Sequence, residues 1–453
     1  KTDKIDYNKA VGTLKDMGLS WLSKPPHSPA ILIHYIERGH KAELPFVPEF
    51  AHDLTRAQKL IEGEFYDIMP ISVEFVPTLN CTCRCQQCSY KMQKISCGVW
   101  PLNNISDPRW HMKMDIVKPL VQRIADAGIR YMVVTGGGEP LMNSRVTLEA
   151  LKEAISHGIE TGLYTNGTCL NRRRANQILD LEPKFVRISV NAGSEEVHTK
   201  YHMPIGKKPL FKNVQEGVKH LALHKAVAGK STEIGLSYIV NPINYKDCGK
   251  FAQWVGNVVS DVAEKAQNDA PSIDFVRFAP TVDYFSHMQH SQEFFDEAVD
   301  LIEGEAIPVL NKVNVSTTLF IHRFQHIGEK KEYGECLGCP WFAEVSPDGS
   351  LYVCCEMNFF PAYRIGDLLS NSLQTVWLSE KRRHVLSRLK LSRLRGCPVF
   401  CKPHKINKIA NKIREGCKVA SKKDHIGQWL KDLNNLHNWR GDEFFKKPKT
   451  VAF

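Results

Sequence analysis

Short apolar segments alternate with longer amphipathic segments between residue 71 and about residue 280. The apolar segments have the length and composition of strands, and they are residues 71–77, 131–135, 160–164, 185–190, 233–240 and 273–278. Apolar positions recur at helical spacing between them, in residues 114–127, 147–157, 172–179, 210–224 and 247–263. Strands and helices that alternate in this way form a parallel sheet with crossover helices. The pattern therefore predicts an α/β fold, a partial (β/α)6 barrel similar to the TIM barrel.

The rest of the chain divides around this barrel into segments of different character. We predict a helical N-terminal extension at residues 1–68, the barrel at 69–305, a connecting segment at 306–335, a small cysteine-rich domain at 336–420 and a tail at 421–453. The extension is broken by a proline-rich stretch at residues 24–29 and is expected to serve packing. The connecting segment contains an amphipathic helix and a strand near residues 312–320. Active sites of parallel barrels lie on the loops that follow the strands, so chemistry is expected there.

Composition and charge exclude some classes of protein and leave others open. No apolar run approaches the roughly 18 residues of a membrane span, and residues 1–16 have no apolar signal core, so we expect a cytoplasmic protein without a membrane partner. The 60 basic and 49 acidic residues give a net charge of +11, with much of the excess between residues 381 and 423. This excess indicates either a solvated helical surface or an acidic, phosphorylated or nucleic-acid substrate.

The 14 cysteines are many for a chain whose thiols stay reduced, and they are clustered. Eight lie within residues 81–88 and 336–355, and three more are Cys397, Cys401 and Cys417. Cys97, Cys169 and Cys248 stand alone, as small buried cysteines usually do. The clusters indicate metal or iron–sulfur ligation rather than disulfides.

The first cluster, Cys81-Thr-Cys-Arg-Cys85-Gln-Gln-Cys88, follows the first predicted strand and contains CxxxCxxC if Cys83 is skipped. Three thiolates this close can hold a four-iron cluster and leave one iron without a protein ligand. That iron can chelate the amino and carboxylate groups of a methionine moiety, and an electron passed to the sulfonium then breaks a carbon–sulfur bond. A structural zinc site, or Cys83 in place of one of the three, is the alternative.

A second motif, Val-Val-Thr-Gly-Gly-Gly-Glu-Pro at residues 133–140, follows the second strand. Its glycines let the backbone approach a ligand closely, and Glu139 can accept hydrogen bonds from an ammonium group. CxxxCxxC after strand one and GGEP after strand two together resemble the radical SAM superfamily, over about residues 71–280. The resemblance implies an enzyme that binds S-adenosylmethionine (SAM) and a four-iron cluster and receives electrons from a low-potential donor such as flavodoxin or ferredoxin.

The same resemblance implies roles for individual residues. Cys81, Cys85 and Cys88, called the three cluster cysteines below, are expected to ligate the SAM-binding cluster. The residues expected to bind SAM itself are Gly137, Gly138 and Glu139 at the methionine amino group, and Asn166, Ser189 and Asn191 at the nucleoside and carboxylate. The chain departs from the family at Gln87, where an aromatic residue is usual, and we predict that Tyr90 supplies the adenine contact.

The second cysteine region resembles the SPASM and twitch extensions of radical SAM enzymes. Cys336-Leu-Gly-Cys339 is followed by nine residues, Gly349, four residues and Cys354, and Cys397-Pro-Val-Phe-Cys401 fits the closing segment. The further CxxC pair of full SPASM domains is missing from residues 387–395. The resemblance thus implies one auxiliary four-iron cluster, held by four of Cys336, Cys339, Cys354, Cys397 and Cys401. Cys339 and Cys354 are the expected members of an otherwise open set, Cys355 and Cys417 are expected bystanders, and a zinc site is the alternative. A tight hairpin is predicted at residues 346–350.

The substrate is indicated only by short likenesses. Residues 234–242 and 273–278, with 164–166, are similar to radical SAM dehydratases and deaminases of antibiotic sugars. They favour a small polar metabolite, such as an amino sugar or nucleoside, that undergoes elimination, oxidation or epimerisation in a biosynthetic pathway. Tyr238 and Arg277 are the expected catalytic residues, and Asp283 and Tyr284 lie nearby in sequence. The alternatives are a maturase that modifies a ribosomal precursor peptide, and a non-catalytic iron–sulfur or zinc scaffold that binds nucleic acid through the basic tail.

Overall fold

A computed structural model gives the three-dimensional arrangement of a large part of the chain. It describes residues 59, 64–88, 110–206, 208–267, 271–282, 291–325, 331, 333–355, 358, 360–388, 401–404, 406, 407, 410 and 411. Several residues named above lie outside these, namely Tyr90, Cys97, Asp283, Tyr284, Cys397 and Cys417. The predicted N-terminal extension also lies outside them, apart from Lys59 and residues 64–68.

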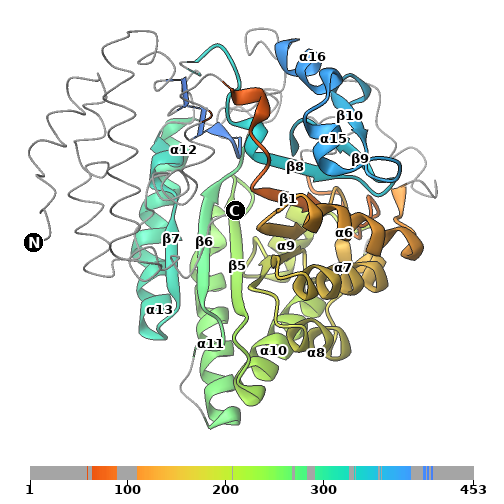
Figure 1. The fold of residues 1–453 in the computed structure, drawn as a ribbon. Helices are drawn as coiled ribbons and strands as arrows, with labels where there is room; N and C mark the ends of the chain where they lie inside the picture. The colour runs from red at the N-terminus through yellow and green to blue at the C-terminus, as the bar shows by residue number, and fades with distance from the viewer. Residues whose placement is uncertain are drawn as a thin grey trace, which may run out of the picture.

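The described strands form one sheet in the order β10-β9-β8-β1-β2-β3-β4-β5-β6-β7 (Figure 1). The first seven in sequence run parallel and are β1 (Ser72–Phe75), β2 (Tyr131–Val134), β3 (Glu160–Thr165), β4 (Phe185–Ser189), β5 (Glu233–Val240), β6 (Phe275–Pro280) and β7 (Ser316–Leu319). The six predicted strands are confirmed. The strand expected in the connecting segment is β7, and it extends the same sheet beyond β6.

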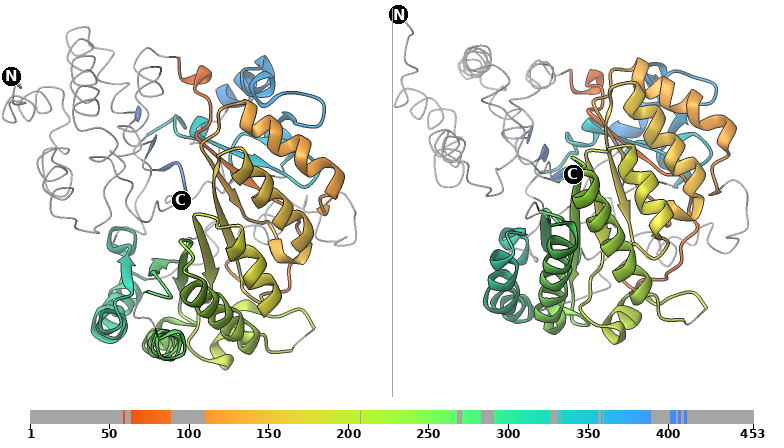
Figure 2. Two further views of the ribbon diagram at one scale, coloured as in Figure 1. Left: turned by 60° about the horizontal axis from the view of Figure 1, so that its bottom comes forward. Right: turned by 90° about the horizontal axis from the view of Figure 1, so that it is seen from below.

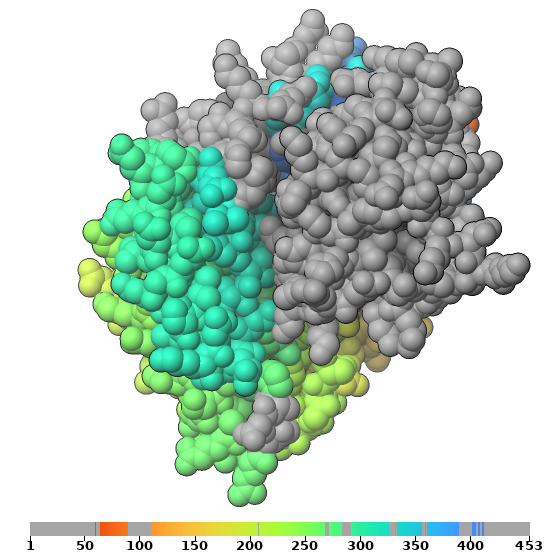
Figure 3. Space-filling view, turned by 90° about the vertical axis from the view of Figure 1, so that its left-hand side faces the viewer, coloured from red at the N-terminus to blue at the C-terminus, as the bar shows by residue number. Residues whose placement is uncertain are grey.

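The five predicted crossover helices are also confirmed, and they cover the outer side of the curved sheet (Figures 1 and 2). They are α6 (Val117–Asp126), α7 (Ser144–Ser156), α8 (Arg172–Asp180), α10 (Phe211–Ala228) and α11 (Cys248–Ala266). The periodicity did not indicate the short α9 (Glu195–His202), which precedes α10. After β6 come α12 (Gln292–Leu301), a π-helical turn η9 (Ile302–Ala306), α13 (Ile307–Lys312) and, beyond β7, α14 (Ile321–Gln325). These residues form much of the face seen in Figure 3.

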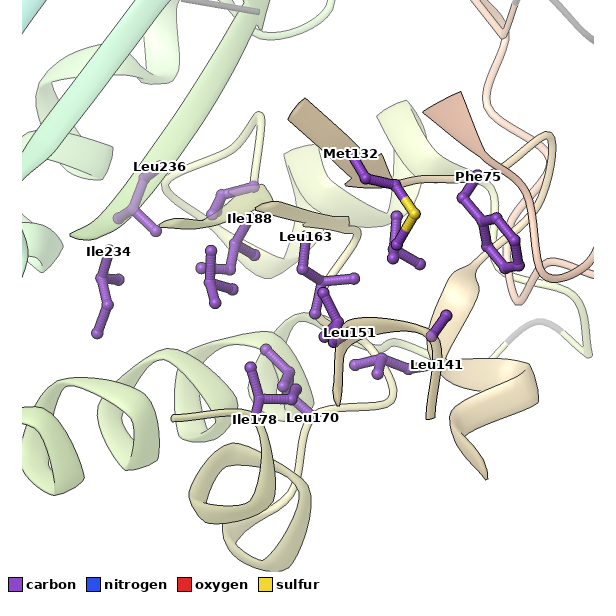
Figure 4. Close-up of a cluster of buried hydrophobic side chains, with 14 of the residues drawn as sticks. Phe75, Met132, Leu141, Leu151, Leu163, Leu170, Ile178, Ile188, Ile234 and Leu236 are labelled. Carbon is purple, nitrogen blue, oxygen red and sulfur yellow. The ribbon is translucent and has the colours of Figure 1, made fainter. Parts of the chain in front are cut away.

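The core lies between the sheet and the outer helices, because alternate residues of each strand point to that side. Figure 4 shows Phe75, Met132 and Leu163 of the strands facing Leu141 and Leu151 of the helical layer. The other face of the sheet is the inner face of the barrel. At its amino-terminal end the rings of Phe185 and Phe275 cross the neighbouring strands, where a Cβ on Gly162 or Gly235 would lie 2.1 Å from them.

The cysteine-rich segment continues the sheet on the other side of β1. Strand β8 (Phe342–Val345) runs parallel to β1, and β9 (Ser350–Tyr352) and β10 (Arg364–Asp367) follow in antiparallel order. The predicted hairpin joins β8 to β9, and Gly349 at its turn has a φ of +77°, which favours glycine. Helices α15 (Leu373–Trp377) and α16 (Glu380–Arg388) pack beside β10. Within the described ranges, no helix is long and apolar enough to cross a membrane.

Candidate functional site

The CxxxCxxC motif occupies the loop after β1, residues 81–88, which we call the cysteine loop. Two other segments hold it by backbone hydrogen bonds. The Glu139 amide donates to the carbonyl of Asn80 (2.7 Å), and on the other side the Arg84 amide donates to the carbonyl of His202 (3.0 Å). Cys83 also forms an isolated antiparallel bridge with Pro204. The glycine motif after β2 and the end of α9 thus fix the loop at the carboxyl ends of the strands.

The four cysteines of the loop are not equivalent in position. Cys83 is buried, with 7% exposure, and its Sγ lies 3.6 Å from Thr82 Oγ1, whereas the three cluster cysteines are half-buried. Burial raises the pKa of Cys83 to about 11, and it raises the pKa of Cys81 and of Cys85 further. Neighbouring thiols raise the pKa of Cys85 as well, because negative charges at this spacing repel. An iron cluster, which takes thiolates, would relieve this repulsion.

Glu139 is the centre of a buried hydrogen-bond network. Its Oε1 accepts from the Leu141 amide (3.0 Å) and Thr165 Oγ1 (2.6 Å), and its Oε2 accepts from the Asn166 amide (2.7 Å). Burial raises the pKa of Glu139, and these hydrogen bonds oppose that rise. The carboxylate therefore joins the glycine motif to the end of β3, and this network supports it independently of the predicted ammonium contact.

Close packing also accounts for one glycine of this motif. A Cβ on Gly138 would lie 2.1 Å from the carbonyl oxygen of Asn80, so any other residue would push the glycine motif away from the cysteine loop. The predicted SAM contacts of Gly137 and Gly138 stay predictions.

Asn166, which follows β3, lies against the cysteine loop. Its Nδ2 donates to Thr82 Oγ1 (3.1 Å) and lies 3.7 Å from Cys81 Sγ, while its Oδ1 accepts from the amide (3.0 Å) and hydroxyl (2.6 Å) of Thr168. Thr82, Thr168 and Asn166 thus orient one another beside Cys81, the first cluster cysteine. The described contacts of Asn166 are with the chain itself, and its predicted contact with SAM stays a prediction.

Ser189 and Asn191 differ in what they face. Ser189 ends β4, half-buried, in register with Ser237 of β5. Asn191 is 3% exposed, has a φ of +55°, and its Oδ1 accepts from the Ile239 amide (2.7 Å). Its carboxamide therefore binds the backbone of β5.

Tyr238 does not face the inner side of the barrel, and its predicted catalytic role is corrected. The side chain is fully buried on the helix side, its ring 4.9 Å from that of Phe251 on α11, and its hydroxyl donates to the Asn244 carbonyl (2.5 Å). Alternation along the strand gives the inner position to Ser237 instead. Arg277 of β6 is in register with Ser237 on the inner face, with its guanidinium 4.2 Å from the centre of the Phe320 ring, and its predicted catalytic role stays a prediction.

The inner face of the barrel carries further polar residues that the sequence did not single out. Arg187 of β4 lies over the Tyr164 ring of β3 at 3.6 Å. Lys402, next to Cys401, reaches Glu74 of β1 with its Nζ 2.8 Å from Oε1. Burial lowers the pKa of Lys402, but Glu74, Cys355 and Tyr164 raise it more, so the net shift is upward. A mixed set of charges therefore lines the sheet between the two cysteine regions.

The second cysteine region brings distant ligand candidates together. Asn407 donates through Nδ2 to Cys336 Sγ (3.3 Å) and accepts through Oδ1 from the Gly338 amide (2.7 Å), which fixes the segment after Cys401 against the loop of Cys336 and Cys339. Cys339 and Cys401 are buried. Cys354 is also buried, just after β9. Four of the five predicted auxiliary ligands are thus described.

The residues present are suited to the groups that the motifs imply. Among the described residues near the cysteine loop, Asn80 Oδ1 and Gln87 Oε1 are buried polar atoms without a hydrogen-bond partner, which is typical of a site that awaits a polar ligand. No group of three or more His, Cys, Asp or Glu in the described part of the chain is placed to hold a single metal ion. Cluster thiolates stand farther apart than the ligands of one ion.

The strand order and the cysteine loop define a class of protein, the parallel α/β barrels with a cluster site after the first strand. Residues 75–240 match the model of the radical SAM superfamily, and residues 336–402 match SPASM, an iron–sulfur cluster-binding domain. The chain is a radical SAM protein with a SPASM-type C-terminal domain. Members of this superfamily are enzymes, and the two domains indicate SAM and four-iron clusters, including an auxiliary one.

Solved structures with a similar fold share little sequence with the chain. One is anSMEcpe with bound AdoMet and the Kp18Cys peptide, at 15% identity, TM-score 0.47, and coverage of 81% of this chain and 99% of that one. Another is SuiB of Streptococcus suis bound to S-adenosylmethionine, at 13% identity, TM-score 0.46, and coverage of 84% of this chain and 82% of that one. A third is BtrN in complex with AdoMet and 2-DOIA, at 13% identity, TM-score 0.36, and coverage of 72% of this chain and 88% of that one. No curated protein sequence matches the chain.

Proposed function

We propose that this enzyme abstracts a hydrogen atom from a small polar metabolite, of the amino-sugar or nucleoside type, bound inside the partial barrel. The observation that carries the proposal is the polar inner face of the sheet. Tyr164, Arg187 and Glu74 lie there, with Lys402 reaching in from the C-terminal domain. A surface of mixed charge and hydroxyl groups suits a substrate rich in hydroxyl and amino groups.

The three cluster cysteines would hold the SAM-binding cluster, and Asn166 would orient the first of them. Asn80 and Gln87 would offer their amide oxygens to SAM, since Asn80 Oδ1 and Gln87 Oε1 are buried atoms without a hydrogen-bond partner among the described residues. When bound, the cluster and SAM supply a 5′-deoxyadenosyl radical by reductive cleavage of a carbon–sulfur bond. The chain's own contribution is to hold the substrate carbon near that radical and to exclude water.

Ser237 of β5 and Arg277 of β6 would orient the substrate. They are neighbours in register on the inner face, and an arginine there can bind phosphate or carboxylate in a bidentate pair. Elimination, or oxidation of a carbinol, would make the enzyme a lyase or an oxidoreductase. Loss of water or ammonia marks an elimination, and solvent deuterium in the product marks an epimerisation.

Four of Cys336, Cys339, Cys354, Cys397 and Cys401 would hold the auxiliary cluster. It would either accept the electron that remains after hydrogen abstraction or only hold the domain together. A flavodoxin or ferredoxin would serve as the electron donor.

The test is 5′-deoxyadenosine formation by the anaerobically reconstituted protein with a low-potential reductant and a panel of amino sugars and nucleosides. Product is analysed by mass spectrometry after reaction in deuterated water. We expect SAM cleavage that increases with a member of the panel, and an Arg277→Gln variant with a raised KM. A cross-linked or methylated peptide as the only product would overturn the metabolite assignment, and absence of SAM cleavage would overturn catalysis altogether.

A further inference from the structure

The end of α9 runs alongside the cysteine loop and brings a histidine to it. Met203, with a φ of +49°, turns the chain after His202, and the Ile205 amide donates to the Thr82 carbonyl at 2.8 Å. The Arg84 amide donates to the His202 carbonyl (3.0 Å). These contacts, together with the Cys83 bridge to Pro204, form a short antiparallel strap over the loop. The strap fixes the His202 backbone relative to the cysteines.

The His202 ring lies between a cluster cysteine and the end of β4. It is 2% exposed, and its Nδ1 lies 3.2 Å from Cys85 Sγ. Its Nε2 lies 3.1 Å from the Val190 carbonyl oxygen and 3.5 Å from Asn191 Nδ2. Both ring nitrogens therefore have partners, and the ring cannot swing away without losing them.

Asn191 gives the ring a hydrogen-bond donor beside the Val190 carbonyl. Its Oδ1 accepts from the Ile239 amide (2.7 Å), so its Nδ2 must point to the other side, towards His202 Nε2. Nε2 thus faces one acceptor, the Val190 carbonyl, and one donor, Asn191. A neutral imidazole has one N–H, and this pair of neighbours gives either tautomer a partner.

We infer that His202 is a positioning residue for the SAM-binding cluster: its fixed ring would donate Nδ1–H to Cys85 Sγ when that sulfur ligates the cluster. With the ring hydrogen on Nδ1, Nε2 would accept from Asn191 Nδ2. This inference rests on the proposed function.

The neighbouring ring of His198 supports a fixed plane for His202. The two ring centroids are 4.4 Å apart, and His198 is fully buried with no hydrogen-bond partner for either nitrogen among the described residues. Phe211 packs on the same histidine, with ring centroids 5.1 Å apart. His198 therefore serves as a flat packing surface, and it leaves the polar contact with the cluster to His202.

A hydrogen bond to a ligating sulfur raises the reduction potential of a cluster, because it stabilises the more negative reduced form. Loss of the Nδ1–H donor should therefore lower the ratio of reduced to oxidised SAM-binding cluster about tenfold at a fixed potential, which is about 59 mV for one electron. A role in packing alone would leave the potential of loaded protein unchanged.

Two amide variants separate the two edges of the ring. The amide of His202→Asn can occupy the place of Nδ1 and donate to Cys85, whereas that of His202→Gln reaches the place of Nε2 and keeps only the Val190 contact. His157→Gln, at the end of α7, is the control for loss of a histidine elsewhere. The readouts are iron content and the midpoint potential of the EPR signal that responds to added SAM.

We expect the His202→Gln variant alone to show the lowered potential, or a selective loss of iron, while the His202→Asn variant and the control stay close to wild type. Equal effects in both variants, an effect confined to the Asn variant, or no effect in either would overturn it. If the wild-type protein itself gives no SAM-responsive signal, the proposed function has failed instead, so the two failures are distinguishable.

Discussion

Replacing Glu139 by alanine should destabilise the apoprotein by about 4 kcal/mol. The change removes the acceptor of three hydrogen bonds, and two of the three donors, the Leu141 amide and the Thr165 hydroxyl, belong to residues exposed by 3% or less. A buried donor left without an acceptor costs roughly 1–3 kcal/mol, so two at about 2 kcal/mol each give the estimate. The third donor, the amide of half-buried Asn166, can reach water and adds little.

Glu139→Gln should cost far less, about 1 kcal/mol. Its amide oxygen can take the place of Oε1 and accept from Leu141 and Thr165, and only the contact with the Asn166 amide is lost, because two N–H groups then face each other. The order Ala, Gln, wild type in rising stability is therefore the signature of this network.

The assay is urea denaturation of anaerobic apoprotein, followed by far-UV circular dichroism. Glu149→Ala on α7 is the matched control, because the ion pair of Glu149 among the described residues is with the exposed Lys118 (3.4 Å), and surface pairs are worth less than about 1 kcal/mol. If Glu139→Ala costs no more than this control, the carboxylate does not hold the loop. Its predicted contact with the SAM ammonium would then be its main role.

Three further outcomes are expected. Reconstituted protein should contain about eight irons per chain, from two four-iron clusters, and a count near four would exclude the auxiliary cluster. Alanine at all three cluster cysteines should abolish 5′-deoxyadenosine formation, while Cys83→Ala should keep it. Cys354→Ala should still cleave SAM but form no product. Loss of cleavage in Cys83→Ala alone would contradict the ligand assignment. Burial lowers the pKa of His198 from 6.5 to about 3, so its contribution to stability is complete above pH 6.5 and declines as the pH falls towards 3. The apoprotein should lose about 1.4 kcal/mol per pH unit in that window through His198, and His198→Phe, but not the exposed His384→Phe, should flatten the slope of unfolding free energy against pH.

The local patterns of the sequence were sufficient for the barrel and for the chemistry of its first loop. Strands and crossover helices follow from periods of two and 3.6 residues, which neighbouring side chains reveal without any tertiary contact. Cysteine spacing likewise fixes how many thiolates a short loop can offer to one cluster. The SPASM-type domain was indicated by a resemblance to a known family, and the motif that carries it, Gly349 with its flanking cysteines, lies close together in sequence.

The sequence did not show which side chains of a fully buried strand point inward. Strand β5 reads Glu-Ile-Gly-Leu-Ser-Tyr-Ile-Val and is buried over most of its length on both faces, so the alternation does not show which residues point inward. The sequence favoured Tyr238 as a catalytic residue, and only the packing of α11 against the sheet shows that Ser237, not Tyr238, faces inward.

Contacts between distant residues were decided by tertiary structure alone. Cys85 and His202 are 117 residues apart, and Glu74 and Lys402 are 328 apart. Such pairs meet because the parallel sheet brings every strand end to one edge and because β8 places the C-terminal domain beside β1. The sequence determined which chemistry the cysteine loop can perform, and the packing of the sheet determined which side chains surround it, because side-chain neighbours across strands depend on register and not on position along the chain.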